Sequence, residues 1–282
     1  MSASPSRPFA VVTGASSGIG LELAKLFAAD GYDLLVVSED DSIYGVAQQL
    51  LSGAQGSVAA VQIDLATDGG VDELYEQIKL ADRPLDAIAL NAGVGAGGAF
   101  VPGSHPSGHD TDLVDELRII DLNIRSTVHL AKHVLADMVA RNHGRVLVTS
   151  SIASTMPGSF QAVYNGSKSF VQSWVLALRD ELRDTEVSVT SLMPGATDTD
   201  FFRRAGMLDT KVGASDSKDD PAEVARMGYE AMLAGKERAV AESIGTKMQA
   251  EVSRVLPDRV KAVMHRNMAE PGSASGRARR RH

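Results

Sequence analysis

The sequence contains no cysteine, so it can form no disulfide, no thiolate metal site and no cysteine nucleophile. It also lacks any apolar run approaching the roughly 20 residues that a helix needs to cross a bilayer. The first eight residues, Met1 to Pro8, are polar and do not resemble the apolar core of a signal peptide. We therefore expect a cytoplasmic protein that has no membrane partner.

Acidic residues outnumber basic ones along the chain. Lys and Arg number 28 against 36 Asp and Glu, which gives a net charge of −8 and argues against a nucleic-acid partner. The one basic cluster, residues 277–281, follows a Gly- and Ser-rich stretch at the C-terminus. We expect residues 1–8 and 271–282 to be disordered and residues 9–270 to form a single domain.

Short β-branched segments alternate with amphipathic ones through most of the chain. This alternation predicts an α/β fold, a single-domain Rossmann-type doubly wound parallel sheet flanked by helices. Strands are expected at 9–13, 33–38, 57–63, 85–90, 144–149 and 187–193, with a shorter one at 239–241. The first helix is expected to follow the glycine loop after the first strand and to end at about residue 30. Further helices are expected over about 70–81, 111–141, 159–184 and 221–234, and residues 242–268 are expected to be mostly helical.

A glycine-rich loop, Gly14 to Gly20, stands between the first strand and the first helix. This order suits a dinucleotide, because glycines let the backbone approach a pyrophosphate and the helix N-terminus faces its charge. The second strand ends at Ser38–Glu39–Asp40–Asp41, without Lys or Arg. A carboxylate accepts hydrogen bonds from a ribose 2′-hydroxyl and repels a 2′-phosphate. The sequence therefore favours NAD(H), with NADP(H) as the alternative.

Tyr164 and Lys168 are four residues apart on a predicted helix and so share one of its faces. Tyr has an ordinary pKa of about 10, and a nearby ammonium can lower it far enough for acid–base work near pH 7. Ser150 and Ser151 follow the fifth strand, at the sheet edge where parallel strands present ligand chemistry. This combination predicts proton transfer at that edge.

Two histidine pairs and one irregular segment carry weaker signals. His105 and His109 fall in a polar loop, and His129 and His133 lie four apart on a predicted helix with no third ligand in view. We therefore predict no metal site. Residues 199–220 are expected to form a lid-like segment, with a partly buried connector as an equal alternative.

Taken together, these motifs resemble the short-chain dehydrogenase/reductase family in order and in spacing, over about residues 9–240. Thr13 to Gly20 is similar to its glycine motif, Asn91–Ala92–Gly93 to its sheet-stabilising motif, and Pro194–Gly195 with Thr199 to its nicotinamide loop. The resemblance implies the catalytic residues Asn123, Ser151, Tyr164 and Lys168. It implies cofactor binding by Gly14, Ser16, Ser17, Gly18, Ile19, Gly20, Glu39, Asp64, Leu65, Asn91, Ala92, Gly93, Tyr164, Lys168, Pro194, Gly195, Thr197 and Thr199.

The resemblance also implies an activity and an assembly. The expected reaction is hydride transfer between NAD(P) and a carbonyl or secondary alcohol of a moderately apolar small molecule, with Tyr164 as acid and base. A homodimer or homotetramer is expected, paired through the helices that carry Asn123 and Tyr164. The alternative is a catalytically inactive nucleotide-sensing protein on the same fold. A sugar-nucleotide epimerase is disfavoured because its glycine loop usually has another spacing.

Overall fold

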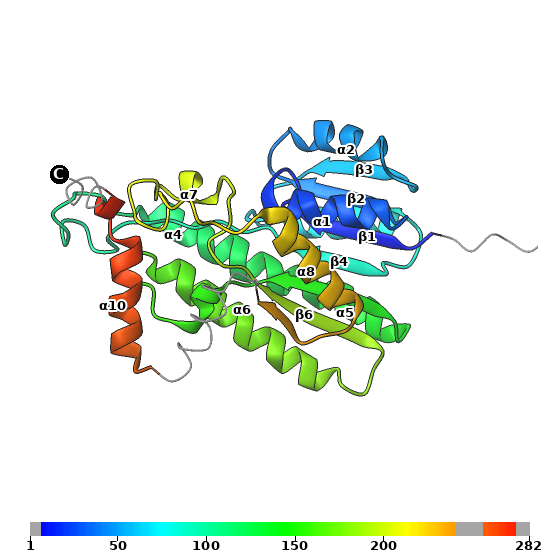
Figure 1. Ribbon diagram of the computed structural model, residues 1–282. Coiled ribbons are helices and arrows are strands. Elements are labelled where there is room, and N and C mark those ends of the chain that lie inside the picture. The colour runs from blue at the N-terminus through cyan, green and yellow to red at the C-terminus, as the bar shows by residue number, and fades with distance from the viewer. Residues whose placement is uncertain (1–6, 241–255, 275–282) are drawn as a thin grey trace, which may run out of the picture.

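The computed structural model describes residues 7–240 and 256–274. Within these residues seven strands form one parallel sheet in the order β3-β2-β1-β4-β5-β6-β7 (Figure 1). This order is that of a doubly wound sheet, so the predicted fold class is confirmed. The strands are β1 (Phe9–Thr13), β2 (Asp33–Ser38), β3 (Val58–Gln62), β4 (Ala87–Leu90), β5 (Gly144–Thr149), β6 (Val187–Met193) and β7 (Arg238–Val240).

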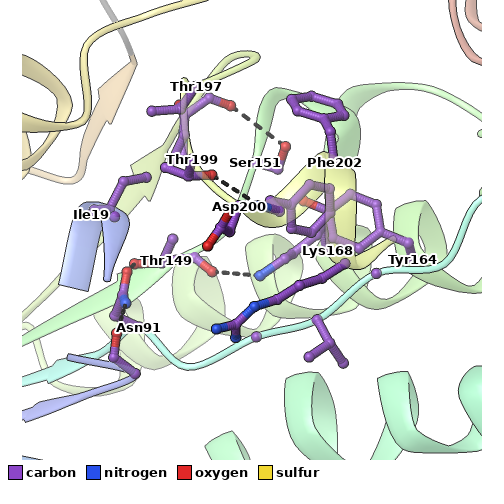
Figure 2. Close-up of a pocket in the computed structure, with 18 of the residues that line it drawn as sticks. Ile19, Asn91, Thr149, Ser151, Tyr164, Lys168, Thr197, Thr199, Asp200 and Phe202 are labelled. Atoms are coloured by element: carbon purple, nitrogen blue, oxygen red, sulfur yellow. Dashed lines mark hydrogen bonds between the residues drawn. The ribbon is translucent and has the colours of Figure 1, made fainter. Parts of the chain in front are cut away.

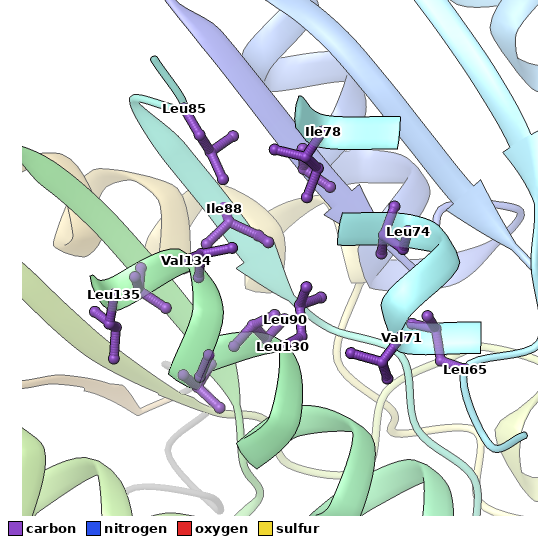
Figure 3. Close-up of a cluster of buried hydrophobic side chains, with 14 of the residues drawn as sticks. Leu65, Val71, Leu74, Ile78, Leu85, Ile88, Leu90, Leu130, Val134 and Leu135 are labelled. Carbon is purple, nitrogen blue, oxygen red and sulfur yellow. The ribbon is translucent and has the colours of Figure 1, made fainter. Parts of the chain in front are cut away.

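Helices cover both faces of the sheet because successive strand residues point to opposite sides. On one face, Val12 and its neighbours pack against α1 (Gly18–Ala29), α2 (Ile43–Leu51) and α8 (Pro221–Leu233). On the other, Val11 and its neighbours pack against α3 (Gly70–Leu80), α5 (Thr127–Ala140) and α6 (Ala162–Glu181). Figure 3 shows part of this second core, where Leu130 of α5 lies near Leu90 of β4 and Leu74 of α3 belongs to the same cluster.

The helix expected over 111–141 has an irregular centre. It comprises α4 (Leu113–Ile119), a π-helical segment η1 (Ile120–Ser126) and α5. The prediction of continuous α-helix was therefore wrong, because i→i+4 periodicity cannot reveal one wide turn. The helix that carries Tyr164 begins at Ala162 rather than near Ser159, after a short 3₁₀ turn, η2 (Ile152–Thr155). The sequence reasoning did not identify α2 at all.

The C-terminal part of the described chain lies against the sheet's carboxyl end. Helix α10 (Asp258–Ala269) begins directly after Pro257 and stands beside the short helix α7 (Phe201–Arg204) and the start of α6 (Figure 1). Residues 271–274 were predicted to be disordered, but Gly272 and Ala274 donate backbone hydrogen bonds to Asp209 at 2.7 and 2.9 Å. That part of the prediction was wrong, and residues 1–6, 241–255 and 275–282 lie outside the described residues. Across the described ranges no helix combines the length and apolarity that a membrane crossing requires.

Candidate active site

A cavity of about 610 Å³ opens at the carboxyl ends of the central strands (Figure 2). It brings together the residues that the sequence assigns to the cofactor, from six separate stretches of chain, as well as Ser151. Asn123 lies behind the cavity rather than on its wall. The lining includes Gly14, Ser16, Ser17, Gly18, Ile19, Gly20, Glu39, Asp64, Leu65, Asn91, Ala92, Gly93, Tyr164, Lys168, Pro194, Gly195, Thr197 and Thr199.

The glycine loop between β1 and α1 has no room for side chains at its critical positions. Gly14 has φ +66°, and a Cβ there would stand 2.8 Å from the Cα of Ala92. A Cβ on Gly20 would lie 2.0 Å from the Gly14 carbonyl oxygen. Ser17, the N-cap of α1, makes no side-chain hydrogen bond to the first turn. The backbone can thus approach a pyrophosphate, and the positive end of α1 is suited to its charge.

Asn91, at the end of β4, ties three strands together at the cavity floor. Its side-chain nitrogen donates to the Thr13 carbonyl at 3.2 Å, and its side-chain oxygen accepts from the Thr149 hydroxyl at 3.0 Å. The Thr13 hydroxyl in turn accepts from the Asn91 backbone N–H at 3.0 Å. These bonds fix the relative positions of the glycine loop and of the strand end that leads to Ser151.

A guanidinium lies beside Glu39 and Asp64 of the cavity lining, where the sequence indicated only acidic residues. Arg118 of α4 donates to both carboxylate oxygens of Asp64, at 3.0 and 3.2 Å, and also pairs with Glu39. Burial raises the pKa of Asp64, but the Arg118 and Ala66 hydrogen bonds outweigh it and lower that pKa overall. Sequence reasoning missed Arg118 because its partners are 54 and 79 residues away.

Asn123 occupies the π-helical segment, and its side chain is fully used. Its Oδ1 accepts from the Val94 N–H at 2.9 Å, and its Nδ2 donates to the Val94 carbonyl at 2.9 Å and to Ser167 Oγ at 3.1 Å. π-Helical turns concentrate at functional sites. Here the wide turn brings an amide between the loop after β4 and helix α6, next to Lys168.

Lys168 and Tyr164 meet at the centre of the cavity wall. Lys168 is buried, and its Nζ donates to the Thr149 carbonyl at 2.9 Å while lying 5.8 Å from the centroid of the Tyr164 ring (Figure 2). Burial lowers the pKa of Lys168 to about 8. Burial also raises the pKa of Tyr164 to about 12, although a hydrogen bond with the Ser151 side chain lowers it in part.

The expectation that Lys168 brings the pKa of Tyr164 down toward neutrality was therefore wrong for this structure. The ammonium is directed at a backbone carbonyl and lies over the ring, and desolvation of the phenol outweighs the favourable interactions. Ser150 and Ser151 are now distinguishable. Ser150 Oγ donates to the Lys168 carbonyl at 3.2 Å, whereas Ser151 is the serine that hydrogen-bonds Tyr164.

The remaining cavity wall combines the polar side chains of Gln161, Asp200, Arg204, Ser217 and Asp219 with apolar ones, and part of it comes from a segment that the sequence left unassigned. Phe201 of α7 packs on Tyr164 with ring centroids 5.1 Å apart, and Met268 and Ala269 of α10 line the same wall. His265 also lines it, and burial lowers its pKa although its Nδ1 hydrogen-bonds the Ser159 carbonyl at 3.0 Å. The hydropathy pattern of a helix does not show which part of the fold it packs against, so the sequence did not predict that α10 lines the cavity.

Comparison with known proteins identifies the family. The family model described as short chain dehydrogenase matches residues 8–207. A probable NADP-dependent dehydrogenase of Haemophilus influenzae is 33% identical over 187 residues, which cover 66% of this chain and 70% of that protein.

Two solved structures share the fold. A short-chain dehydrogenase from Sphingobium yanoikuyae in complex with NADPH superposes with a TM-score of 0.75 at 24% identity, over 88% of this chain and 93% of that one. A short-chain dehydrogenase/reductase from Burkholderia phymatum in complex with NAD superposes with a TM-score of 0.77 at 21% identity, over 94% and 97%. With the family match, the sheet order and the cavity in agreement, the chain belongs to the short-chain dehydrogenase/reductase family and is an NAD(P)-dependent oxidoreductase acting on alcohol or carbonyl groups.

Proposed function

We propose that Tyr164, Ser151 and Lys168 carry out the proton-transfer half of a carbonyl–alcohol interconversion. The observation that supports this most is that these three side chains line one cavity with the glycine loop, with Tyr164 hydrogen-bonded to Ser151. The nicotinamide cofactor, when bound, supplies or accepts the hydride. The glycine loop, the N-terminus of α1 and Thr199 would hold it.

Each side chain has a distinct role in this proposal. Tyr164 Oη gives its proton to the substrate oxygen in reduction and takes one back in oxidation. With a pKa raised to about 12, Tyr164 is protonated at pH 7, which is the state that reduction requires. Ser151 Oγ donates a hydrogen bond to the same oxygen. Lys168 would hold the cofactor's ribose, and Asn123 is a positioning residue that fixes the loop after β4 beside it.

NAD(H) is the cofactor that the charges at the adenosine end favour. Glu39 and Asp64 share one guanidinium, Arg118, so the trio carries a net negative charge. Asp40 is paired with Arg204 at 3.1 Å. A 2′-phosphate would have to displace Glu39 from Arg118, whereas a ribose hydroxyl can donate to the Glu39 carboxylate. The related structures that hold NADPH and NAD do not decide between the two.

The substrate is expected to be a moderately apolar ketone or secondary alcohol. Met156, Phe201, Phe202 and Met268 offer mainly carbon to the part of the cavity near Tyr164. Phe160 does not line the cavity, because its ring packs against the cluster that contains Phe202 and Ala269. Helix α10 contributes Met268 to the wall. Phe201 and Phe202 of α7 and Met268 of α10 line the space that an apolar substituent of the substrate would fill.

One experiment tests cofactor and substrate together. Purified protein is titrated with NADH and NADPH by nicotinamide fluorescence, and we expect tighter NADH binding. In Glu39→Gln, Arg118 is released from one carboxylate, so NADPH affinity should rise about tenfold, or about 1.4 kcal/mol. Asp41→Asn, in the same exposed turn, should leave both affinities unchanged. Tighter NADPH binding by the unmodified protein would contradict the assignment.

The same preparation, saturated with cofactor, is then offered a panel of ketones. Aryl and branched alkyl ketones should turn over faster than ketones that carry carboxylates or phosphates, because Met156, Phe201, Phe202 and Met268 of the wall cannot solvate a charge. Turnover confined to the charged ketones would refute the apolar substrate class while leaving the cofactor result standing.

We also propose that the protein forms a homodimer or homotetramer through α4 and α6. The two helices pack together and expose large apolar side chains, including Leu113, Val114 and Leu117 of α4 and Phe170 of α6. Contiguous exposed apolar surface is typical of protein interfaces. Light scattering should give the mass of two or four chains, and Val114→Asp should shift it toward one, whereas Val260→Asp on α10 should not. A single-chain mass for the unmodified protein would rule the proposal out.

A further inference from the structure

Three metal-ligating side chains meet on the outer surface of α3 and α5, away from the cavity. His129 and His133 of α5 lie four residues apart, and Asp72 of α3 lies opposite them. The sequence offered no third ligand for this pair, and folding supplies one from a residue 57 positions before His129. We propose that Asp72, His129 and His133 form a binding site for a divalent transition-metal ion, with Zn²⁺ as the expected occupant.

The spacing of the ligand atoms is the first support for the site. The Nε2 atoms of His129 and His133 face the same carboxylate oxygen, Asp72 Oδ1, at 3.2 and 3.9 Å. All three ligand atoms lie within 4.8 Å of one another. Ligands bound about 2.0–2.1 Å from a tetrahedral Zn²⁺ stand about 3.3–3.4 Å apart. Small side-chain rotations would therefore bring the three atoms to one ion.

The surroundings hold the ligands in this arrangement. The Tyr75 ring stacks on His133 with centroids 4.5 Å apart and planes at 19°. Tyr75 is itself fixed, because its hydroxyl donates to Asp137 at 2.9 Å. The two helices cannot drift apart, since their inner faces share the core around Leu74 and Leu130 (Figure 3). Three positions on a rigid helix pair need little reorganisation to bind an ion.

The ligand types select the class of metal. Two imidazoles and one carboxylate suit Zn²⁺, Co²⁺, Ni²⁺ or Cu²⁺, whereas Mg²⁺ and Ca²⁺ prefer oxygen ligands throughout. All three side chains are partly exposed, so a fourth position would be open to water or to another ligand. An ion here would link α3 to α5 and so bind the folded chain preferentially. This inference does not depend on the proposed roles of Tyr164 and Lys168.

Zinc binding is measured on the untagged full chain by equilibrium dialysis and calorimetry. We expect one Zn²⁺ per chain, and a Tm that rises by about 5 °C at a hundredfold excess over Kd. Asp72→Asn, His129→Ala and His133→Ala should each weaken binding at least about tenfold, since even outer-shell changes cost that much. His143→Ala is the matched control, because His143 is exposed and pairs with Asp86 at 3.6 Å but stands outside this group.

A Co²⁺ titration followed by visible absorption reports the geometry of the ligands around the bound ion. We expect an intense band typical of tetrahedral Co²⁺ in the unmodified chain and no such band in His129→Ala. Circular dichroism without metal checks that each variant is folded. If a histidine variant folds poorly, Asp72→Asn still tests the site, because it changes only an exposed carboxylate. Equal Kd values for the unmodified chain and the three variants would overturn the site. So would one Zn²⁺ per two chains, which indicates bridging between molecules instead.

Discussion

Tyr164→Phe is expected to lower kcat/KM by about 10³–10⁴-fold while leaving the Kd for cofactor nearly unchanged. The substitution removes the one hydroxyl in the proposal that moves a proton, and general acid–base catalysis contributes up to about 10⁴-fold. The ring remains, so its contact with Phe201 and its place above Lys168 are kept. Steady-state kinetics and fluorescence titration on the same preparation measure the two quantities.

Tyr44→Phe is the control for this substitution, because Tyr44 is exposed on α2 and far from the reaction. It should match the unmodified enzyme in both measurements. If Tyr164→Phe lost cofactor affinity and turnover together, the result would indicate damaged folding. If it kept turnover, the assignment of Tyr164 as the proton donor would be wrong.

Lys168→Met is expected to lower turnover by about 10²-fold or more and to make the protein more stable at pH 7. Burial lowers the pKa of Lys168 to about 8 from its ordinary 10.5, which corresponds to a cost of about 3 kcal/mol for holding the charge in the folded state. Losing the hydrogen bond to the Thr149 carbonyl offsets about 1 kcal/mol of that gain. The net increase in the free energy of unfolding should be about 2 kcal/mol.

The pH dependence gives this prediction a specific form. Between pH 8 and 10.5 the unfolded chain holds a proton on Lys168 that the folded chain has released, so wild-type stability rises with pH in that window. The advantage of Lys168→Met, measured by urea unfolding, should therefore be full below pH 8, pass through zero before pH 10.5 and become a deficit approaching about 1 kcal/mol above it. Lys132→Met, at an exposed position of α5, should show no such change. If Lys168→Met were less stable than wild type at pH 7, the claim that the folded protein holds a charged Lys168 at a cost in free energy would be wrong.

The parts of this site that could be predicted from the sequence are those whose geometry is local. The glycine loop needs only a strand, a turn and a helix in succession, and Tyr164 and Lys168 are set on one face by helical periodicity alone. The doubly wound sheet followed in the same way from alternating segments. These features depend on the local sequence and not on contacts with distant parts of the chain.

The parts that could not be predicted depend on contacts between distant segments. Arg118 reads as a surface residue of a helix until the fold brings Glu39 and Asp64 to it. Asp72 reads as a first-turn carboxylate until α5 packs against α3. The pKa of Tyr164 depends on how much water the folded protein excludes, which spacing along a helix does not reveal. α10 reaches the cavity by tertiary packing, and nothing in its composition marks that destination.

The π-helical segment η1 sets the position of Arg118 on α4 relative to Asn123 and α5. Each residue of an α-helix advances its neighbours by about 100° around the axis. Were all seven residues 120–126 to close into ordinary α-helix, α4 would be rotated by up to about that angle relative to α5. Arg118 would swing off Asp64, and Asn123 would lose its register with Val94. The contact of Arg118 with Asp64 and that of Asn123 with Val94 therefore both depend on the wide turn of η1.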